Sequence, residues 1–184
     1  MGNWFTKVWS RLFSAREEVK LLIVGLDAAG KTTILYRMRS NELVSSKPTI
    51  GFNLEELSMK NVNVKVWDLS GQEKMRSVWK HYYTSVKGVI FVLDSSNLDR
   101  IPEARDELHA VLAEQELKHA PILILANKQD LPESLSYQAI REQLALCGED
   151  ERRHIKIQEA SALLDKGLTE GFEWIVDMIA KAKK

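Results

Sequence analysis

Short apolar runs alternate with helix-like segments along this chain of 184 residues. Six runs predict strands, at residues 19–26, 52–59, 61–69, 88–94, 121–127 and 154–160. Four segments have the apolar spacing of helices, at about 31–40, 99–117, 136–146 and 168–182. This alternation is typical of crossover units around a parallel sheet, so we predict a doubly wound α/β fold with a mostly parallel six-stranded sheet.

The second run predicts an edge strand that is antiparallel to its neighbour. Residues 52–59 alternate apolar and polar side chains, and a short turn at Lys60 and Asn61 leads into residues 62–69. In open sheets of this type, ligands bind outside the carboxyl ends of the strands. We therefore expect the functional residues to follow the strands directly.

Composition and charge add a few limits to this prediction. Lys plus Arg and Asp plus Glu both total 26, so the overall charge gives no reason to expect a nucleic-acid partner. The length predicts one folded domain. The single cysteine, Cys147, fits a reducing compartment, where we assign it a structural role. No apolar run approaches the roughly 20 residues of a membrane-spanning helix, and no secretory signal begins the chain, so we expect a soluble, intracellular protein.

The loop after the first strand has the pattern of a phosphate-binding site. Its letters GLDAAGKTT match G-x-x-x-x-G-K-[ST]. Two glycines allow a tight loop whose backbone N–H groups converge on phosphate oxygens, and the following helix adds its positive N-terminal end. Lys31 is expected to reach the outer phosphates and Thr32 to bind Mg²⁺. The nucleotide-binding residues predicted here are Asp27, Ala28, Ala29, Gly30, Lys31, Thr32 and Thr33.

Asp27 is unexpected within this loop, because a carboxylate pointing inward would repel phosphates. We expect it to point outward. It is then either an ordinary surface residue or one that holds neighbouring loops or slows hydrolysis.

A second cluster follows the third strand, in the letters VWDLSGQE. Asp68 stands at the strand's end, where such proteins place a carboxylate toward Mg²⁺. Gly71 can bring its backbone N–H to a terminal phosphate, and Gln72 can orient an attacking water as the catalytic residue. A plain polar turn is the alternative for this segment.

The loop after the fifth strand indicates which base is bound. Asn127, Lys128 and Asp130 form an N-K-x-D pattern. A carboxylate at Asp130 can accept two N–H bonds from guanine, whereas adenine has no such pair of donors. After the last strand, Ser161 and Ala162 are small enough for backbone N–H to approach the base, although a simple loop explains them equally well.

Nearly the whole chain resembles the small GTPases of the ADP-ribosylation factor (Arf) and Arf-like family. The stretches GLDAAGKTTIL, PTIGFN, WDLSGQ, ANKQDLP and the N-terminal MGNWF carry the resemblance. It implies the P-loop small GTPase fold, binding of GDP and GTP with Mg²⁺, and GTP hydrolysis. By position, Thr49 resembles the switch I threonine that joins Mg²⁺ and the terminal phosphate, and residues 70–83 resemble switch II. Three apolar residues match the family's effector-contacting trio, with core packing as the alternative: Phe52, Trp67 and Tyr82.

The resemblance implies a cycle in which contacts from Thr49 and Gly71 to the terminal phosphate order the switch loops. Intrinsic hydrolysis is expected to be slow. Fast hydrolysis needs an arginine, and the arginines between the phosphate loop and Asp68 are Arg37 and Arg39, both in the predicted helix. We therefore expect an activating protein to supply it. An exchange factor and effectors complete the expected partners of what we expect to be a monomer.

The N-terminus predicts membrane attachment. MGNWFT matches the myristoylation pattern M-G-x-x-x-[ST], with Gly2 as the acylated residue. Residues 1–16 have an apolar face at helical spacing, which predicts an amphipathic interfacial helix preceding a GTP-binding domain over 17–184. That face could instead pack on the protein itself. The resemblance implies release of the helix to membrane with GTP, vesicle trafficking, and the Golgi or another endomembrane as the location.

Two other functions stay open at this level. A recruitment scaffold with negligible hydrolysis is one, since Ser70 stands where the Arf pattern usually has a glycine. We expect that serine to be neutral unless the backbone there requires positive φ. A P-loop kinase or ATPase is the other, and it requires the Asn127-Lys128-x-Asp130 match to be accidental.

Overall fold

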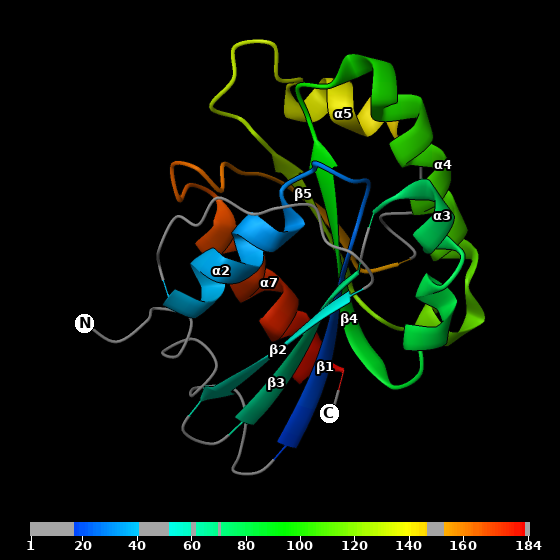
Figure 1. The fold of residues 1–184 in the computed structure, drawn as a ribbon, viewed down its shortest axis with the longest axis vertical. Helices are drawn as coiled ribbons and strands as arrows, with labels where there is room; N and C mark the ends of the chain where they lie inside the picture. The colour runs from blue at the N-terminus through cyan, green and yellow to red at the C-terminus, as the bar shows by residue number, and fades with distance from the viewer. Residues whose placement is uncertain (1–16, 41–51, 60–61, 70, 147–152, 183–184) are drawn as a thin grey trace.

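We describe the fold from a computed structural model, which describes residues 17–40, 52–59, 62–69, 71–146 and 153–182 (Figure 1). The strands are β1 Glu17–Val24, β2 Phe52–Met59, β3 Val62–Leu69, β4 Val86–Asp94, β5 Ile122–Asn127 and β6 Ile155–Glu159. They form one sheet in the order β2-β3-β1-β4-β5-β6, in which β2 pairs antiparallel with β3 and the other pairs are parallel. The predicted fold class, with its antiparallel edge strand, is confirmed, whereas the predicted N-terminal helix lies outside the described residues.

The helices follow the strands along the chain, and all but the short α3 lie close to where the sequence predicts them. They are α2 Lys31–Ser40, α3 Glu73–Arg76, α4 Ile101–Ala113, α5 Tyr137–Gln143 and α7 Leu168–Lys181, with 3-10 turns η1 Trp79–Tyr82, η2 Leu98–Arg100 and η3 Gln115–Leu117. The predicted helix 99–117 is wrong in one respect, because it divides into η2, α4 and η3. Glu114 interrupts it with an extended backbone of φ −71° and ψ 127°. Apolar spacing continues across such a break, so the pattern alone does not reveal it.

Helices cover both faces of the sheet. α2 and α7 lie on one face, and α3, α4 and α5 lie on the other (Figure 1). Alternate residues of β1 divide between the two cores: Leu21 and Ile23 pack with α2 and α7, while Leu22 and Val24 pack with α4 and η1. A strand segment buried on both faces is apolar at successive positions, which explains the apolar run from Leu21 to Val24.

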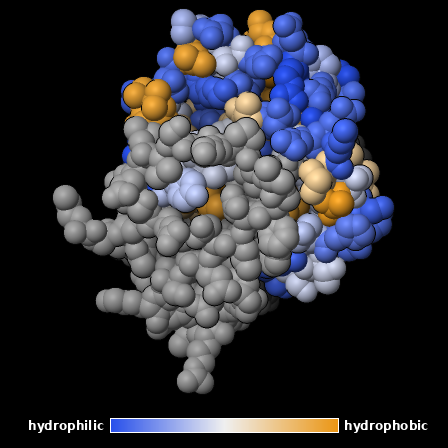
Figure 2. Space-filling view, viewed as in Figure 1, coloured by the Kyte–Doolittle hydropathy of each residue, from blue (hydrophilic) through white to orange (hydrophobic). Residues whose placement is uncertain are grey.

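The described surface is largely hydrophilic on the face shown in Figure 2, with separate apolar spots. Large exposed apolar side chains include Leu98, Leu131, Tyr137, Leu163 and Leu164. Within the described ranges, no helix is long and apolar enough to cross a membrane. The described apolar side chains of the strands and helices are thus mostly buried in the two cores.

Phe172→Ala should destabilise the fold, because Phe172 is 0% exposed in the core beneath α7. We expect a loss of about 3–5 kcal/mol in the free energy of unfolding, from lost transfer energy and the cavity that remains. Urea denaturation followed by circular dichroism measures it. Glu173→Ala, at the neighbouring exposed position, serves as the control and should change stability by about 0.5 kcal/mol or less. Equal effects of the two substitutions would contradict the described packing of α7.

Candidate functional site

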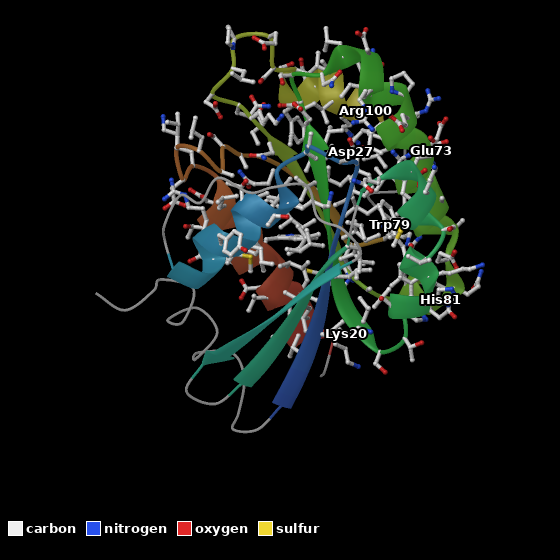
Figure 3. The ribbon with its side chains drawn as sticks, viewed as in Figure 1. Lys20, Asp27, Glu73, Trp79, His81 and Arg100 are labelled. Carbon is white, nitrogen blue, oxygen red and sulfur yellow. The ribbon has the colours of Figure 1, made fainter. Side chains whose placement is uncertain are left out.

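Loops from five strands meet at one edge of the sheet. The parallel register aligns Ile23 of β1 with Asp68 of β3 and with Ile90 of β4, and it aligns Asp94 of β4 with Asn127 of β5. The carboxyl ends of the strands therefore come together, as the sequence predicts. Figure 3 shows Asp27 near this edge, beyond the end of β1, with Lys20 farther back along the strand.

The phosphate loop, residues 25–30, has the backbone of an anion-binding turn. It leaves β1 and enters α2 at Lys31, with left-handed φ values of 61° at Ala28 and 96° at Gly30. The Lys31 ammonium donates to the carbonyl oxygens of Gly25 at 3.0 Å and Leu26 at 2.8 Å. The lysine is only 6% exposed. A cation is thus held within the loop at the start of a helix, where phosphate oxygens are stabilised.

Asn127 connects the phosphate loop to the loop after β6. Its Nδ2 donates to the Ala29 carbonyl at 2.8 Å, and its Oδ1 accepts from the Ala162 N–H at 2.9 Å. Asn127 is 2% exposed, so both bonds are shielded from water. A Cβ at Gly30 would lie 2.4 Å from Asn127 Nδ2, which explains why a glycine is needed there. The predicted asparagine therefore joins three loops of the site, and its role does not require contact with the base.

Asp130 and Ser161 are also brought together. The Ser161 hydroxyl donates to Asp130 Oδ1 and accepts from the Leu164 N–H at 3.1 Å. A carboxylate held in this way is oriented before a guanine arrives, which reduces the entropy that binding must offset. The Ala162 N–H, which the sequence assigns to the base, donates to Asn127 in this structure.

Asp94 is a site residue that sequence reasoning missed. Its Oδ2 lies 2.6 Å from the Lys128 ammonium, while its Oδ1 accepts from the N–H and hydroxyl of Ser96 at 3.1 and 2.7 Å. Burial raises the pKa of Asp94, but the bonds from Lys128 and Ser96 outweigh it and hold the pKa below its usual value. A carboxylate at the end of an apolar strand was the available signal, as it was for Asp68.

Lys128 is fixed at both its backbone and its side chain. Its φ of 68° is unfavourable for a residue with a Cβ. The Ser134 hydroxyl donates to the Lys128 carbonyl at 2.6 Å, and Gln129 donates its N–H to the Ala160 carbonyl at 3.0 Å. Backbone strain held by such bonds concentrates at functional sites, and here it occurs at a residue of the predicted base-binding pattern.

Gly71 packs directly against the phosphate loop. A Cβ at this position would lie 2.3 Å from the Asp27 nitrogen, the Gly25 oxygen and the Leu26 carbonyl carbon. Gln72 follows at the N-terminus of α3 and is exposed. The predicted pair therefore lies at the phosphate loop, with the catalytic candidate open to solvent.

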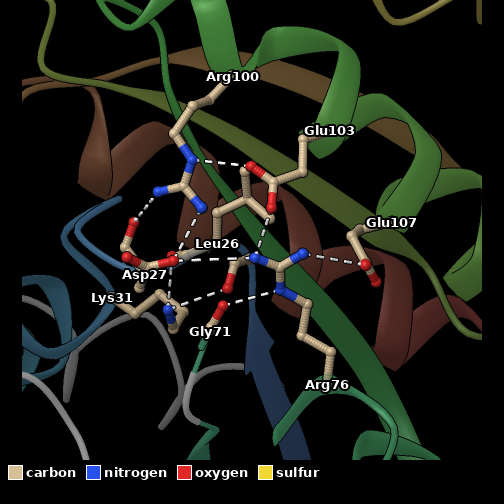
Figure 4. A network of polar contacts seen from close by, with 9 residues as sticks. Leu26, Asp27, Lys31, Gly71, Arg76, Arg100, Glu103 and Glu107 are labelled. Carbon is tan, nitrogen blue, oxygen red and sulfur yellow. Dashed lines mark hydrogen bonds and ion pairs between the residues drawn. The ribbon is translucent and has the colours of Figure 1, made fainter. Parts of the chain in front are cut away.

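Asp27 does point outward, and it holds neighbouring elements. Arg100 donates to the Asp27 carboxylate at 2.8 Å and to the Asp27 carbonyl at 3.2 Å, and Arg76 lies 3.8 Å from the same carboxylate (Figure 4). The hydrogen bond from Arg100 lowers the pKa of Asp27. Arg76 also donates to the Gly71 carbonyl at 2.8 Å. Of the two roles left open, the structure favours holding loops together.

The arginines near the site are bound to acceptors. Arg76 pairs with Glu103 at 2.7 Å and Glu107 at 3.2 Å. Arg37 of α2 donates to the carbonyls of Ala162 at 3.0 Å and Leu163 at 2.8 Å, so it supports the loop after β6. Because these arginines are already bonded within the chain, we still expect the catalytic arginine to come from a partner.

Several predicted residues cannot be tested in this way. Gly2 and Thr49 lie outside the described residues, as does Ser70, and Asp68, Phe52 and Trp67 are described through their backbone. Tyr82 is partly buried against the core beneath η1, which agrees with the packing alternative. Thr32 and Thr33 follow Lys31 in the first turn of α2, as a phosphate loop requires.

The donors fit a bound nucleotide and Mg²⁺. The phosphate loop supplies its backbone, Lys31 and a helix N-terminus, while Asp130, held by Ser161, is the carboxylate predicted to bind the base. Thr32, Thr49 and Asp68 would hold Mg²⁺, whose chemistry is to neutralise charge on the phosphates. Hard oxygen ligands of this kind are those that Mg²⁺ prefers.

Comparison with known proteins agrees with this geometry. The family model "ADP-ribosylation factor family" matches residues 5–179. Among solved structures, the chain is similar to the Arl6 (BBS3) small GTPase from Trypanosoma brucei, solved with the bound nucleotide analogue GppNp. The TM-score is 0.82 at 28% sequence identity, and the match covers 89% of this chain and 98% of that one.

Asp94→Asn should accelerate nucleotide release, because it removes the charge that holds Lys128. We expect about a tenfold faster dissociation of fluorescent GDP, because the substitution removes one charge-assisted hydrogen bond. Since the pKa of Asp94 is lowered in the folded protein, the pairing is complete at neutral pH and is lost as the pH falls below the usual carboxyl range of about 4. Asp99→Asn, at an exposed position nearby, is the control. Identical rates for the two variants would show that Asp94 has no positioning role.

Proposed function

Because this chain belongs to the ADP-ribosylation factor family, a family of GTP-hydrolysing switches, we propose that it recruits effectors to membranes when GTP is bound. The cofactors are guanine nucleotide and Mg²⁺. The partners are an exchange factor, an activating protein and effectors, all of which contact the switch loops. The location is the cytoplasmic surface of the Golgi or another endomembrane, in vesicle trafficking.

The close packing of Gly71 on the phosphate loop carries this proposal. Its surroundings leave no room for a side chain, with three loop atoms at 2.3 Å from a hypothetical Cβ. A terminal phosphate in the loop would therefore be next to the start of switch II. Its presence or loss changes the contacts available to Gly71, and α3 and η1 follow directly in the chain.

Hydrolysis depends on residues of this chain in three roles. Lys31 and the loop backbone hold the phosphates, and Gly71 fixes the terminal one. Gln72, exposed at the N-terminus of α3, orients the attacking water. The oxygen of that water forms a bond to the terminal phosphorus while the bond from this phosphorus to the bridging oxygen breaks, GDP leaves, and one proton of the water passes to the phosphate product. An arginine from the activating protein stabilises the charge that develops in the transition state.

The effector surface in this proposal combines Phe52, Trp67 and Tyr82. Phe52 and Leu69 are paired across β2 and β3, and Leu54 is paired with Trp67, so the backbone of the edge hairpin places these positions on neighbouring strands. Tyr82 closes η1, which follows α3. A nucleotide-dependent movement of switch II would change the position of Tyr82 relative to the β2–β3 hairpin, and effectors would bind one arrangement better than the other.

Gln72→Leu should remove stimulated hydrolysis while leaving nucleotide binding intact. The assay is single-turnover GTP hydrolysis, alone and with a GTPase-activating domain that acts on Arf proteins. We expect slow hydrolysis alone, acceleration on the order of 10³-fold or more with the domain, and a loss of about 100-fold or more for Gln72→Leu. Gln143→Leu, at an exposed position of α5, is the matched control.

The arginine requirement is tested in the same assay. An activating domain whose arginine is replaced by alanine should lose most of its stimulation. Rapid hydrolysis by the isolated protein would contradict a partner-supplied arginine. A rate that stays negligible with every activating domain would instead favour the recruitment scaffold, and tight ATP binding in competition with GTP would favour a kinase or ATPase.

Membrane attachment should depend on both Gly2 and the nucleotide. One acyl chain anchors a protein only marginally, so release of an amphipathic helix is needed for firm binding. We expect acylated protein loaded with a non-hydrolysable GTP analogue to float with liposomes, and the GDP form to remain largely in solution. Gly2→Ala should remove flotation of both forms. Equal flotation of the two nucleotide forms would refute a switchable anchor.

A further inference from the structure

Asp27 places a negative charge in a loop whose function is to bind anions. It lies between the two motif glycines, and its backbone nitrogen would lie 2.3 Å from a Cβ placed on Gly71. Because the proposed function puts Gly71 at the terminal phosphate, Asp27 belongs to the same end of the loop. Two like charges at such a site repel each other, and the repulsion is stronger there than in bulk water.

Arg100 is placed to cancel this charge. One of its terminal nitrogens donates to Asp27 Oδ1 at 2.8 Å and the other to the Asp27 carbonyl at 3.2 Å. The side chain of Arg100 therefore forms hydrogen bonds with both the carboxylate and the backbone carbonyl of one loop residue. This contact joins η2 to a segment 73 residues earlier in the chain (Figure 4).

Arg100 is itself held from the opposite side. Its Nε donates to Glu103 Oε2 at 2.8 Å, and Glu103 Oε1 accepts from Arg76 at 2.7 Å. The hydrogen bonds that Arg100 donates to Glu103 and Asp27 raise its pKa, so it stays charged. A planar guanidinium that makes two hydrogen bonds loses little further conformational entropy on pairing. Arg100 can therefore keep a fixed position beside Asp27.

We propose that Arg100 is a positioning residue that turns the Asp27 carboxylate away from the phosphate cradle, neutralises it, and so sets the affinity for GTP relative to GDP. This inference rests on the proposed binding of guanine nucleotides. GTP carries one more phosphate and more negative charge than GDP, at the end of the loop where Asp27 lies. Loss of the shield therefore weakens GTP binding more than GDP binding.

The test compares the affinities of the full chain for fluorescent GDP and for fluorescent GppNp in the presence of Mg²⁺. Arg100→Gln should weaken GppNp binding about five- to tenfold and GDP binding about twofold or less, since Arg76 remains 3.8 Å from Asp27 as a partial shield. Arg100→Lys keeps the charge and should lose less. Higher salt should reduce the difference, because part of it is screened.

A double variant separates charge from structure. Asp27→Asn combined with Arg100→Gln should restore the wild-type ratio of the two affinities, because the carboxylate that needs neutralising is gone. Arg105→Gln on α4 is the control, since Arg105 pairs with exposed Asp106 at 3.0 Å and lies outside the network.

The outcomes are distinguishable. Equal weakening of both nucleotides, or no rescue by Asp27→Asn, would show that Arg100 merely supports the loop and would overturn the inference. Thermal melts of each variant identify those that do not fold, and Arg100→Lys then decides through its affinity ratio. A wild-type protein that binds neither nucleotide would overturn the proposed function itself, and the inference with it.

Discussion

The parallel pairing of β1 with β3 and β4 is the constraint on which the rest of the molecule depends. Parallel strands align their carboxyl ends, so every loop that leaves the sheet in this direction arrives at the same edge. Burial of both sheet faces fixes this register, because a shift of one residue would exchange the two cores that Leu21 and Leu22 enter. The site is thus a result of core packing before any polar group contributes.

Polar side chains then complete the alignment that the sheet begins. Asn127 joins the phosphate loop to the loop after β6, and Ser95 donates to the Asn127 carbonyl at 2.6 Å. Ser95 is 0% exposed, and hydrogen bonds in such an environment are costly to leave unmade. Buried bonds of this type specify one geometry where apolar packing would tolerate several.

Charge serves a different purpose at the outer side of the phosphate loop. Two guanidinium groups, from Arg76 and Arg100, meet the carboxylates of Asp27, Glu103 and Glu107. Arg76 is 8% exposed, so removal of one acidic partner would leave a nearly buried cation undercompensated. The network connects switch II with α4 and the phosphate loop, three elements that lie apart in the sequence.

The sequence allowed prediction of the fold class and of the contiguous motifs. The strand β2 was predicted with its observed bounds because alternation and a short turn both indicate it. Asn127, Lys128 and Asp130 were predictable because their chemistry is contained in four residues. The role of Arg100 was not predictable, because its partner Asp27 is 73 residues away. Nothing in the sequence distinguishes this arginine from the other basic residues among the 26. Pairings between distant loops follow from the assembled sheet and have no local pattern.

The bonds of Asn127 also bear on the order in which the chain assembles. The bond to Ala29 spans 98 positions and needs β1 and β5 in place on either side of β4, and the bond to Ala162 spans 35 positions and needs β5 paired with β6. Closing such long loops costs entropy before any bond is gained, so these contacts form late in folding. We therefore expect the phosphate and base loops to take their native arrangement after the strands that carry them have paired. In a newly synthesised chain, the nucleotide would meet a completed core and an unfinished binding site, and it would act as the final folding partner.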